Sequence, residues 1–264
     1  SELEPQGIHA FPRGARAGVC LHDMLEHINF VNANAEHLTE QVEASLQRYG
    51  YVVEHWKDTV VTNMQDVLTT PLTAAGRSLS ELAPAAWLPE MEFHFPLHGL
   101  NGAKIFAVLE KHKFGKGTAI EQRLQQSVSQ RSFPPMDGFM KGFIDLIFEA
   151  DGRYFVADYK SNWLGVDSSA YHSSALDMAI AKADYFLQYL IYTVALHRYL
   201  KTRINDYQYD SHMGGVYYLF LRGMTGAGDV TQEQGGERSG VFYDRPSEAL
   251  VEELDQLFTP MAVA

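Results

Sequence analysis

Residues 142–160 read Gly-Phe-Ile-Asp-Leu-Ile-Phe-Glu-Ala-Asp-Gly-Arg-Tyr-Phe-Val-Ala-Asp-Tyr-Lys. Both halves of this stretch are rich in aromatic and β-branched residues, which is typical of β-strands. The Asp151-Gly152 pair between the two halves is a hairpin turn signal. The stretch therefore predicts an antiparallel hairpin over roughly residues 139–160, and this hairpin decides the core of the fold.

The predicted hairpin carries charged residues on an apolar background. Asp145 lies in the first strand and Asp158 in the second, so antiparallel pairing brings the two carboxylates near each other. Side chains alternate between the faces of a strand, so Asp158 and Lys160 point the same way, roughly 7 Å apart. Charges are costly to bury unless they pair or hold a metal. Two carboxylates and an ammonium on this hairpin therefore indicate a functional site.

Composition places the chain among ordinary globular proteins and excludes several classes. Of the 264 residues, 46% are hydrophobic and 20% are charged. No apolar run approaches the roughly 20 residues that a membrane span needs. Ser1 to Pro5 lack the basic and apolar parts of a signal peptide, so we expect a cytoplasmic location. The single cysteine, Cys20, excludes an internal disulfide and any four-cysteine zinc or iron–sulfur site.

The charge balance bears on the binding partner. The net charge of −12 argues against broad nonspecific binding to DNA, for which a basic surface is expected. It is compatible with a metal-binding active site, because such a site needs carboxylates. The sequence contains no Gly-x-x-x-x-Gly-Lys-Ser/Thr motif and therefore no recognisable ATP motor.

Hydrophobic periodicity and turn signals predict the remaining elements. We expect helices near 17–29, in two segments of 34–70 that break at Gly50, near 172–201 and near 246–258. We expect strands at 90–97, 214–221 and 241–243. The other segments are expected to be mainly irregular, with 133–138 a loop and 225–240 a mobile loop. The whole is expected to form one domain, residues 1–264, with a helical N-terminal region at about 16–90, a catalytic core at about 91–224 and a C-terminal loop and helix at 225–264.

Four blocks of sequence resemble one nuclease family: residues 141–146, 158–165, 188–192 and 214–223. With the order Glu92, Asp145, Asp158, Lys160, they are similar to the PD-(D/E)xK nuclease superfamily. Within it they resemble the C-terminal nuclease domain of RecB-type subunits of exonuclease V, the RecBCD helicase–nuclease. The N-terminal half matches more loosely, chiefly at 11–12 and 21–26. The resemblance implies an α/β, restriction-endonuclease-like core, in which helices flank a mixed central sheet, with a helical N-terminal region.

The resemblance also implies roles for individual residues. The implied catalytic residues are Asp145, Asp158 and Lys160. The implied metal ligands are His22, Asp145, Asp158 and the backbone carbonyl of Tyr159. Support of the site or contact with DNA is implied for Glu92, Gln188 and Tyr192. The implied ion is Mg²⁺, a hard cation that prefers oxygen. Mn²⁺ is an accepted substitute because His22 is a softer ligand, and Ca²⁺ is expected to occupy the site without supporting catalysis.

The activity implied by the resemblance is a Mg²⁺-dependent exodeoxyribonuclease of the exonuclease V type, with single-stranded DNA endonuclease activity in addition. Its implied setting is double-strand break repair and DNA degradation. The implied partners are single-stranded DNA ends, RecC-like and RecD-like subunits, a helicase portion absent from this chain and the recombinase RecA. No membrane partner is expected.

Alternatives remain open at the level of sequence. Taken singly, Asp158 and Lys160 are compatible with a surface ion pair, and His22 with an ordinary helix histidine. The chain is also compatible with a catalytically silent interaction module that docks RecA or a partner subunit, although such a module has no need for the intact Asp145, Asp158 and Lys160 set. A nuclease of the AddAB or CRISPR-associated type is a third hypothesis, but one cysteine excludes its iron–sulfur versions.

Overall fold

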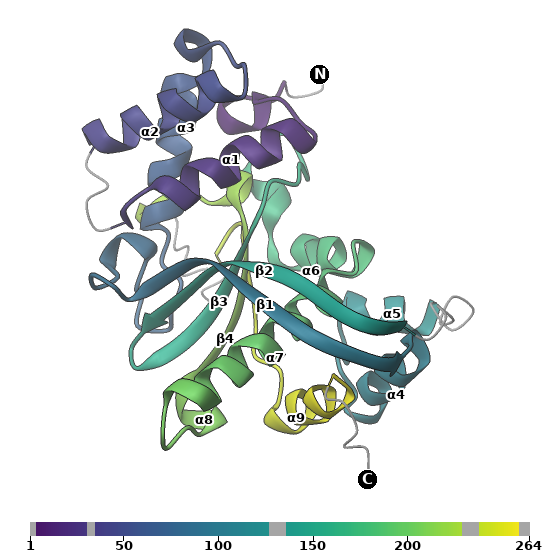
Figure 1. Cartoon of the computed structure of the whole chain (residues 1–264). Coiled ribbons are helices and arrows are strands. Elements are labelled where there is room, and N and C mark those ends of the chain that lie inside the picture. The colour runs from purple at the N-terminus through teal and green to yellow at the C-terminus, as the bar shows by residue number, and fades with distance from the viewer. Residues whose placement is uncertain (1–3, 31–34, 127–135, 229–237, 259–264) are drawn as a thin grey trace.

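The computed structural model describes residues 4–30, 35–126, 136–228 and 238–258. Five strands in this part of the chain form one sheet in the order β1-β2-β3-β4-β5 (Figure 1). Their bounds are β1 Trp87–Leu100, β2 Met136–Ala150, β3 Arg153–Lys160, β4 Met213–Phe220 and β5 Val241–Asp244. β3 and β4 are parallel and the other neighbours are antiparallel. The expected mixed sheet with flanking helices is confirmed.

The predicted hairpin is confirmed and is longer than expected. Ala150 pairs with Arg153 across a two-residue turn. Asp151 and Gly152 in this turn have φ angles of 54° and 75°. Positive φ at both central positions is characteristic of a type I′ turn, whose twist matches that of the flanking strands. β2 begins at Met136, so the loop expected at 133–138 is wrong for its last three residues; the first three lie outside the described residues.

Helices cover both faces of the sheet (Figure 1). One face packs against α1 (Ala15–His27), α2 (Ala35–Arg48) and α3 (Val53–Thr69). The expected break between α2 and α3 is confirmed at Gly50, where φ is 70°. The other face packs against α6 (Ser173–Lys182), α7 (Tyr185–Arg203), the short α8 (Tyr209–His212) and α9 (Glu248–Leu257). None of the described helices has the length and apolar character that a bilayer span requires.

Two helices occur where none was expected. α4 (Gly102–Lys111) and α5 (Ala119–Gln126) lie between the strand expected at 90–97 and the predicted hairpin, in a segment that was expected to be mainly irregular. Each buries only a pair of large apolar side chains, Val108 and Leu109 in α4 and Ile120 and Leu124 in α5. Helices of this length are shorter than the window of about 11–18 residues over which periodicity can be recognised.

The single long helix expected at 172–201 is also wrong. α6 ends at Lys182, and Asp184 adopts a left-handed φ of 54° before α7 begins at Tyr185. The Asp184 carboxylate accepts two hydrogen bonds from the guanidinium of Arg123 in α5, at 2.9 and 2.8 Å. The break is therefore stabilised by a contact from a distant part of the chain, which local periodicity does not report.

β4 lies between β3 and β5 in the sheet, and every one of its residues is buried. Val216 and Tyr218 face the α7 side of the sheet, whereas Tyr217 and Leu219 face α1–α3. A strand covered on both faces reads as a continuous apolar run, as this one does. The parallel pairing of β3 with β4 requires a crossover connection, which α6 and α7 provide.

Candidate active site

Asp145 and Asp158 lie where β2 and β3 separate. The ladder between these strands runs up to the pair Leu146–Ala157, and the two aspartates are the next residues on each strand. Beyond that pair, the backbone N–H of Tyr159 donates a hydrogen bond of 2.9 Å to Oδ2 of Asp145. The side chain of Asp145 therefore bridges the opening between the strands, beside Asp158.

Asp158 is a buried carboxylate that forms few polar contacts with the described residues. Its exposed fraction is 2%. Burial and, after it, the charge of Asp145 together raise its pKa to about 7, although the ammonium of Lys160 opposes both effects. Oδ2 of Asp158 forms an ion pair with Lys160 and has no further hydrogen-bond partner among the described residues. A buried carboxylate of this kind, beside a second carboxylate, is suited to a bound cation.

The ammonium of Lys160 is held by a chain of polar contacts. Nζ donates to Oε1 of Gln188 at 3.0 Å, and the phenol of Tyr218 donates to the same oxygen at 2.7 Å. Nε2 of Gln188 donates to the hydroxyl of Tyr192 at 2.8 Å. Nζ also lies over the rings of Tyr185 and Tyr218, 4.1 and 4.6 Å from their centroids. The structure thus brings Gln188 and Tyr192 to the site and adds Tyr185 and Tyr218 to them.

His22 reaches the same place from α1. Its Nδ1 lies 3.5 Å from Oδ2 of Asp145. Its ring stands edge-on to the ring of Tyr159, with 5.7 Å between the centroids. His22, Asp145, Asp158 and Lys160 therefore converge from three elements, α1, β2 and β3. The backbone carbonyl of Tyr159 as a metal ligand stays a prediction.

A buried arginine fixes the position of α1. Arg222 is 1% exposed. Its guanidinium donates hydrogen bonds to the backbone carbonyls of Ser161, Ile8, Phe11 and Pro12. The last three carbonyls lie in the segment that leads into α1, so Arg222 holds the approach to the helix that carries His22 against the end of β3. Arg222 was not among the expected site residues, although a lone cation after an apolar strand was a visible signal.

Glu92 does not lie beside the two aspartates. It pairs with Phe143 in the β1–β2 ladder, and its side chain is exposed. Hydrogen bonds from Lys141 and then from His94 lower the pKa of Glu92. The strand assignment is confirmed, because Glu92, Asp145 and Asp158 lie on the neighbouring strands β1, β2 and β3. A DNA contact by Glu92 stays a prediction.

Two other acidic residues lie near Asp145. Glu90 stands opposite Asp145, between the pairs Pro89–Leu146 and Met91–Ile144. Its φ of 50° is rare for a residue other than glycine, and backbone strain of this kind is common at functional sites. Glu26 lies one helical turn after His22 on α1; burial raises its pKa, and the charges of Glu90 and Asp145 raise it further. The spacing of four from His22 was the signal for Glu26. Glu90 required the strand register, which sequence does not specify to one residue.

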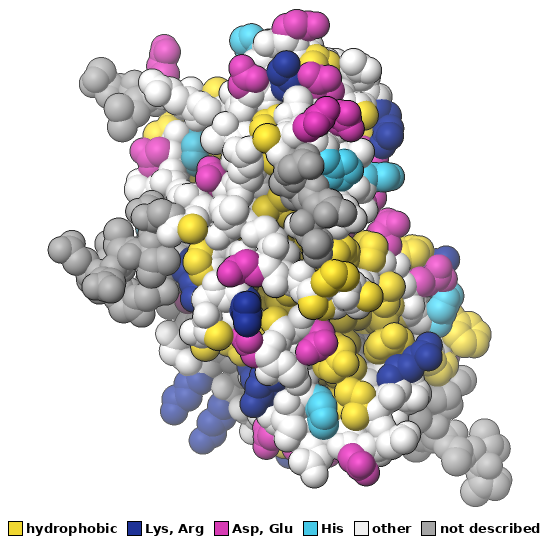
Figure 2. Space-filling view, turned by 90° about the vertical axis from the view of Figure 1, so that its left-hand side faces the viewer, with side chains coloured by type: hydrophobic (Ala, Val, Ile, Leu, Met, Phe, Trp, Pro, Cys, Tyr) yellow, Lys and Arg dark blue, Asp and Glu magenta, His cyan; other side chains and the backbone are white. Residues whose placement is uncertain are grey.

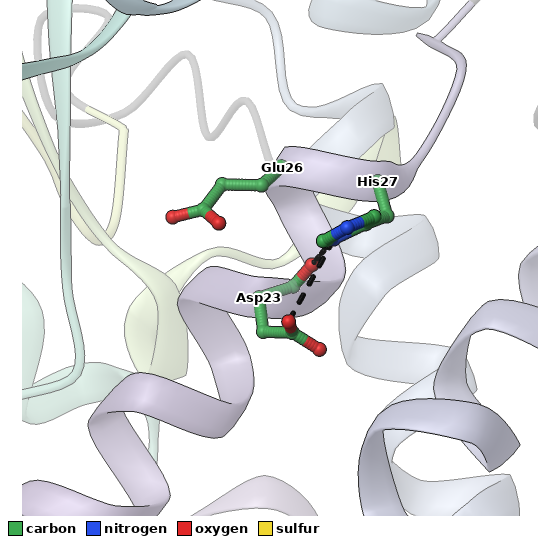
Figure 3. Close-up of side chains that lie close together, drawn as sticks. All are labelled: Asp23, Glu26 and His27. Atoms are coloured by element: carbon green, nitrogen blue, oxygen red, sulfur yellow. Dashed lines mark hydrogen bonds and ion pairs between the residues drawn. The ribbon is translucent and has the colours of Figure 1, made fainter. Parts of the chain in front are cut away.

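A second group of potential ligands lies on α1 (Figure 3). One ligand atom from each of Asp23, Glu26 and His27 lies within 4.8 Å of the others. Nη1 of Arg48 contacts both carboxylate oxygens of Asp23, and the hydroxyl of Ser45 donates to one of them at 2.6 Å. We interpret Asp23 as the anchor between α1 and α2, because its oxygens already have partners.

Comparisons of the sequence with known proteins assign the chain to a family. The sequence profile of the PD-(D/E)XK nuclease superfamily matches residues 4–262. The chain is similar to RecBCD enzyme subunit RecB of Escherichia coli strain K12, with 38% identity over 258 residues that cover 97% of this chain and 20% of the relative. The RecB subunit of Haemophilus influenzae is 35% identical, covering 94% and 19%. That of Mycobacterium tuberculosis strain H37Rv is 33% identical, covering 94% and 24%.

The chain thus spans about a fifth to a quarter of the length of these relatives. The profile covers nearly the whole chain, and the charged residues expected from the resemblance converge in one place. The chain belongs to the PD-(D/E)XK nuclease superfamily.

Proposed function

We propose that this chain is the nuclease part of a RecBCD-type helicase–nuclease and that it hydrolyses DNA phosphodiester bonds with the help of a divalent metal. The convergence of Asp145, Asp158 and Lys160 at the opening between β2 and β3 carries the proposal. The similarity to RecB subunits over most of the chain supports it. A silent interaction module has no use for a buried carboxylate whose pKa is raised to about 7 at the cost of folding.

The side chains present fit a divalent cation. Oδ2 of Asp158 is buried and, apart from its ion pair with Lys160, has no hydrogen-bond partner among the described residues. The charge of Asp145 acts on it, and the imidazole of His22 lies 3.5 Å from Oδ2 of Asp145. Carboxylate oxygens suit Mg²⁺, and an imidazole also accepts Mn²⁺. His22, Asp145, Asp158 and the carbonyl of Tyr159 would hold the ion. A bound divalent cation supplies a lowered pKa of water and a polarised phosphoryl oxygen.

The contribution of the protein side chains is preorganised charge. Lys160 places an ammonium beside the carboxylates, where it steadies negative charge that develops on a phosphate and orients the attacking water. Gln188 accepts hydrogen bonds from both Lys160 and Tyr218, so the ammonium does not need to reorganise during the reaction. Hydrolysis then proceeds by in-line attack of water, without a covalent intermediate.

A more specific activity and a set of partners are also part of the proposal. We propose that the chain acts as a Mg²⁺-dependent exodeoxyribonuclease of the exonuclease V type and also cuts within single strands. The RecB relatives are named as subunits of the RecBCD enzyme, which supports a helicase portion and RecC-like and RecD-like subunits as partners. A contact with RecA is a further part of the proposal.

Cleavage of a single-stranded oligonucleotide tests the proposal. We expect the chain to cleave it with Mg²⁺ or Mn²⁺ and to stop when EDTA is added. Asp158→Asn should lose about 10²-fold or more of the rate, since it removes one carboxylate of the site. Asp206→Asn is the matched control, because Asp206 is exposed and lies between α7 and α8. Full activity of Asp158→Asn, or a wild-type chain that binds no metal by calorimetry, would refute the assignment.

A further inference from the structure

Residues 92–97 of β1 pair with residues 138–143 of β2, and this part of the sheet has one face covered by helices and one open face. Phe93, Phe95 and Leu97 of β1 are buried in the core that includes α7 and α9. Glu92 and His94, which alternate with these residues along the strand, are exposed. In Figure 1 these two strands run from below α1 towards α4 and α5. The helical layer of α1–α3 covers only the other end of the open face, where Leu146 and Phe148 of β2 are buried.

Two phenyl rings stand on the open face of β2. Phe139 is 79% exposed and Phe143 is 46% exposed. Lys141 lies between them in sequence, and its Nζ is 5.1 Å from the centroid of the Phe143 ring. The solvated face of an antiparallel sheet is normally polar, so these rings need an explanation. In the view from the left-hand side of Figure 1, hydrophobic side chains gather below the N-terminal helices and border basic and histidine side chains (Figure 2).

The exposed rings are continuous with the catalytic centre. Phe139, Lys141, Phe143 and Asp145 are alternate residues of β2. Alternate residues share a face and are roughly 7 Å apart, so the two rings are roughly 14 Å apart and Asp145 is the next residue in the row. The contact of Asp145 with His22 places it at the edge of the α1–α3 layer. The two faces of β2 exchange at this point, because Ile144 packs in the core of α7 and Leu146 in the core of α1–α3. On β1, Glu92 lies opposite Phe143, and the register places Glu90 opposite Asp145. A polypeptide lying over Phe143 would obstruct the adjacent carboxylate, whereas a nucleic-acid strand has to reach it.

We propose that Phe139, Lys141 and Phe143, here called the aromatic row, bind single-stranded DNA by stacking bases on the two phenyl rings. This inference rests on the proposed nuclease function and names the route of its substrate to Asp145. Base–aromatic stacking tolerates any sequence, as a degradative nuclease requires. It also suits a chain with a net charge of −12, whose grip on DNA cannot come from a basic surface.

The charges of the open face agree with this mode of binding. Lys141 forms an ion pair of 2.9 Å with Glu92, which also accepts a hydrogen bond of 2.6 Å from His94. A backbone phosphate would compete with Glu92 for the Lys141 ammonium. The rings therefore supply most of the affinity, and Lys141 supplies a single contact that depends on salt.

Binding of a labelled twelve-residue oligothymidylate to the whole chain, measured by fluorescence anisotropy in EDTA, tests the inference without catalysis. Phe139→Ala and Phe143→Ala should each weaken binding about tenfold. Phe139→Trp should bind at least as tightly as the wild type, whereas Phe139→Leu should behave like Phe139→Ala, because leucine has no π-face. Met178→Ala is the control, since Met178 is 60% exposed on α6, and should bind as the wild type does.

A kinetic measurement separates this inference from the proposed function. Hydrolysis of bis(p-nitrophenyl) phosphate by the wild type reports on the metal centre alone. If the wild type hydrolyses neither this compound nor the oligonucleotide, the nuclease proposal is refuted, whereas the binding measurement still decides on the aromatic row. On the oligonucleotide, Phe139→Ala should raise KM by more than it changes kcat. Unchanged binding by both alanine variants would overturn the aromatic row. So would a Phe139→Leu variant that binds as tightly as the wild type, because that outcome indicates a surface for an apolar protein partner.

Discussion

Arg222 provides the most direct test of how the fold builds the site. Its guanidinium is 1% exposed and donates four hydrogen bonds, all to backbone carbonyls. Arg222→Met removes the donors but keeps a similar buried volume. The carbonyl of Ile8 keeps one partner, the N–H of Phe11, so three carbonyls lose a hydrogen bond without replacement. At about 1–3 kcal/mol for each unsatisfied buried acceptor, we expect a loss of about 3–5 kcal/mol, capped because the N-terminal segment can detach and rehydrate.

Urea unfolding followed by circular dichroism measures this loss. With a slope of about 3 kcal/mol per molar urea for a chain of this size, the midpoint should fall by about 1–2 M. Arg203→Met is the matched control, because Arg203 is exposed at the end of α7, and should change stability by less than about 0.5 kcal/mol. Because Arg222 positions α1, a folded Arg222→Lys variant should also bind Mn²⁺ more weakly by calorimetry. A change below about 1 kcal/mol in Arg222→Met would refute the reasoning.

The remaining predictions concern single groups. Tyr218→Phe removes one hydrogen bond to Gln188 and should lower kcat by roughly 3- to 10-fold. The control is Tyr217→Phe, which loses one hydrogen bond on the opposite face of the sheet and should leave kcat unchanged. Equal effects of the two variants on kcat would contradict a positioning role for Tyr218. Burial raises the pKa of the Cys20 thiol to about 12, so a disulfide reagent at pH 8 should label Cys20 only after unfolding. Burial lowers the pKa of His197 to about 4, below its value in the unfolded chain. Protons therefore bind the unfolded chain more readily, and the free energy of unfolding should fall by at most about 3 kcal/mol as pH drops from about 6.5 to 4. His197→Gln should flatten that dependence, and an unchanged slope would contradict it.

The hairpin and its charges could be predicted because they depend on local rules. A two-residue Asp151-Gly152 turn between strands sets the register at once, since Ala150 must pair with Arg153. That register places Asp145 and Asp158 side by side, and the alternation of strand side chains aligns Lys160 with Asp158. The family expected from the four sequence blocks is confirmed by the profile match over residues 4–262.

Other parts of the site depend on contacts between distant segments. β1 and β2 are joined through α4 and α5, so no turn sets their register, and a shift of two residues decides whether Glu90 or Glu92 stands opposite Asp145. The break before α7 depends on Arg123 of α5, more than sixty residues away.

The amino-acid sequence by itself therefore determined the strands, the turn and the charged groups of the hairpin, because backbone geometry relates residues that are close in the chain. Only the tertiary structure decided which helix face meets them. His22 and Glu26 reach Asp145 because Arg222 satisfies the carbonyls that precede α1, a contact between residues more than two hundred positions apart. Such a contact depends on the shape of the packed core, since a buried guanidinium is stable only where several acceptors converge on it.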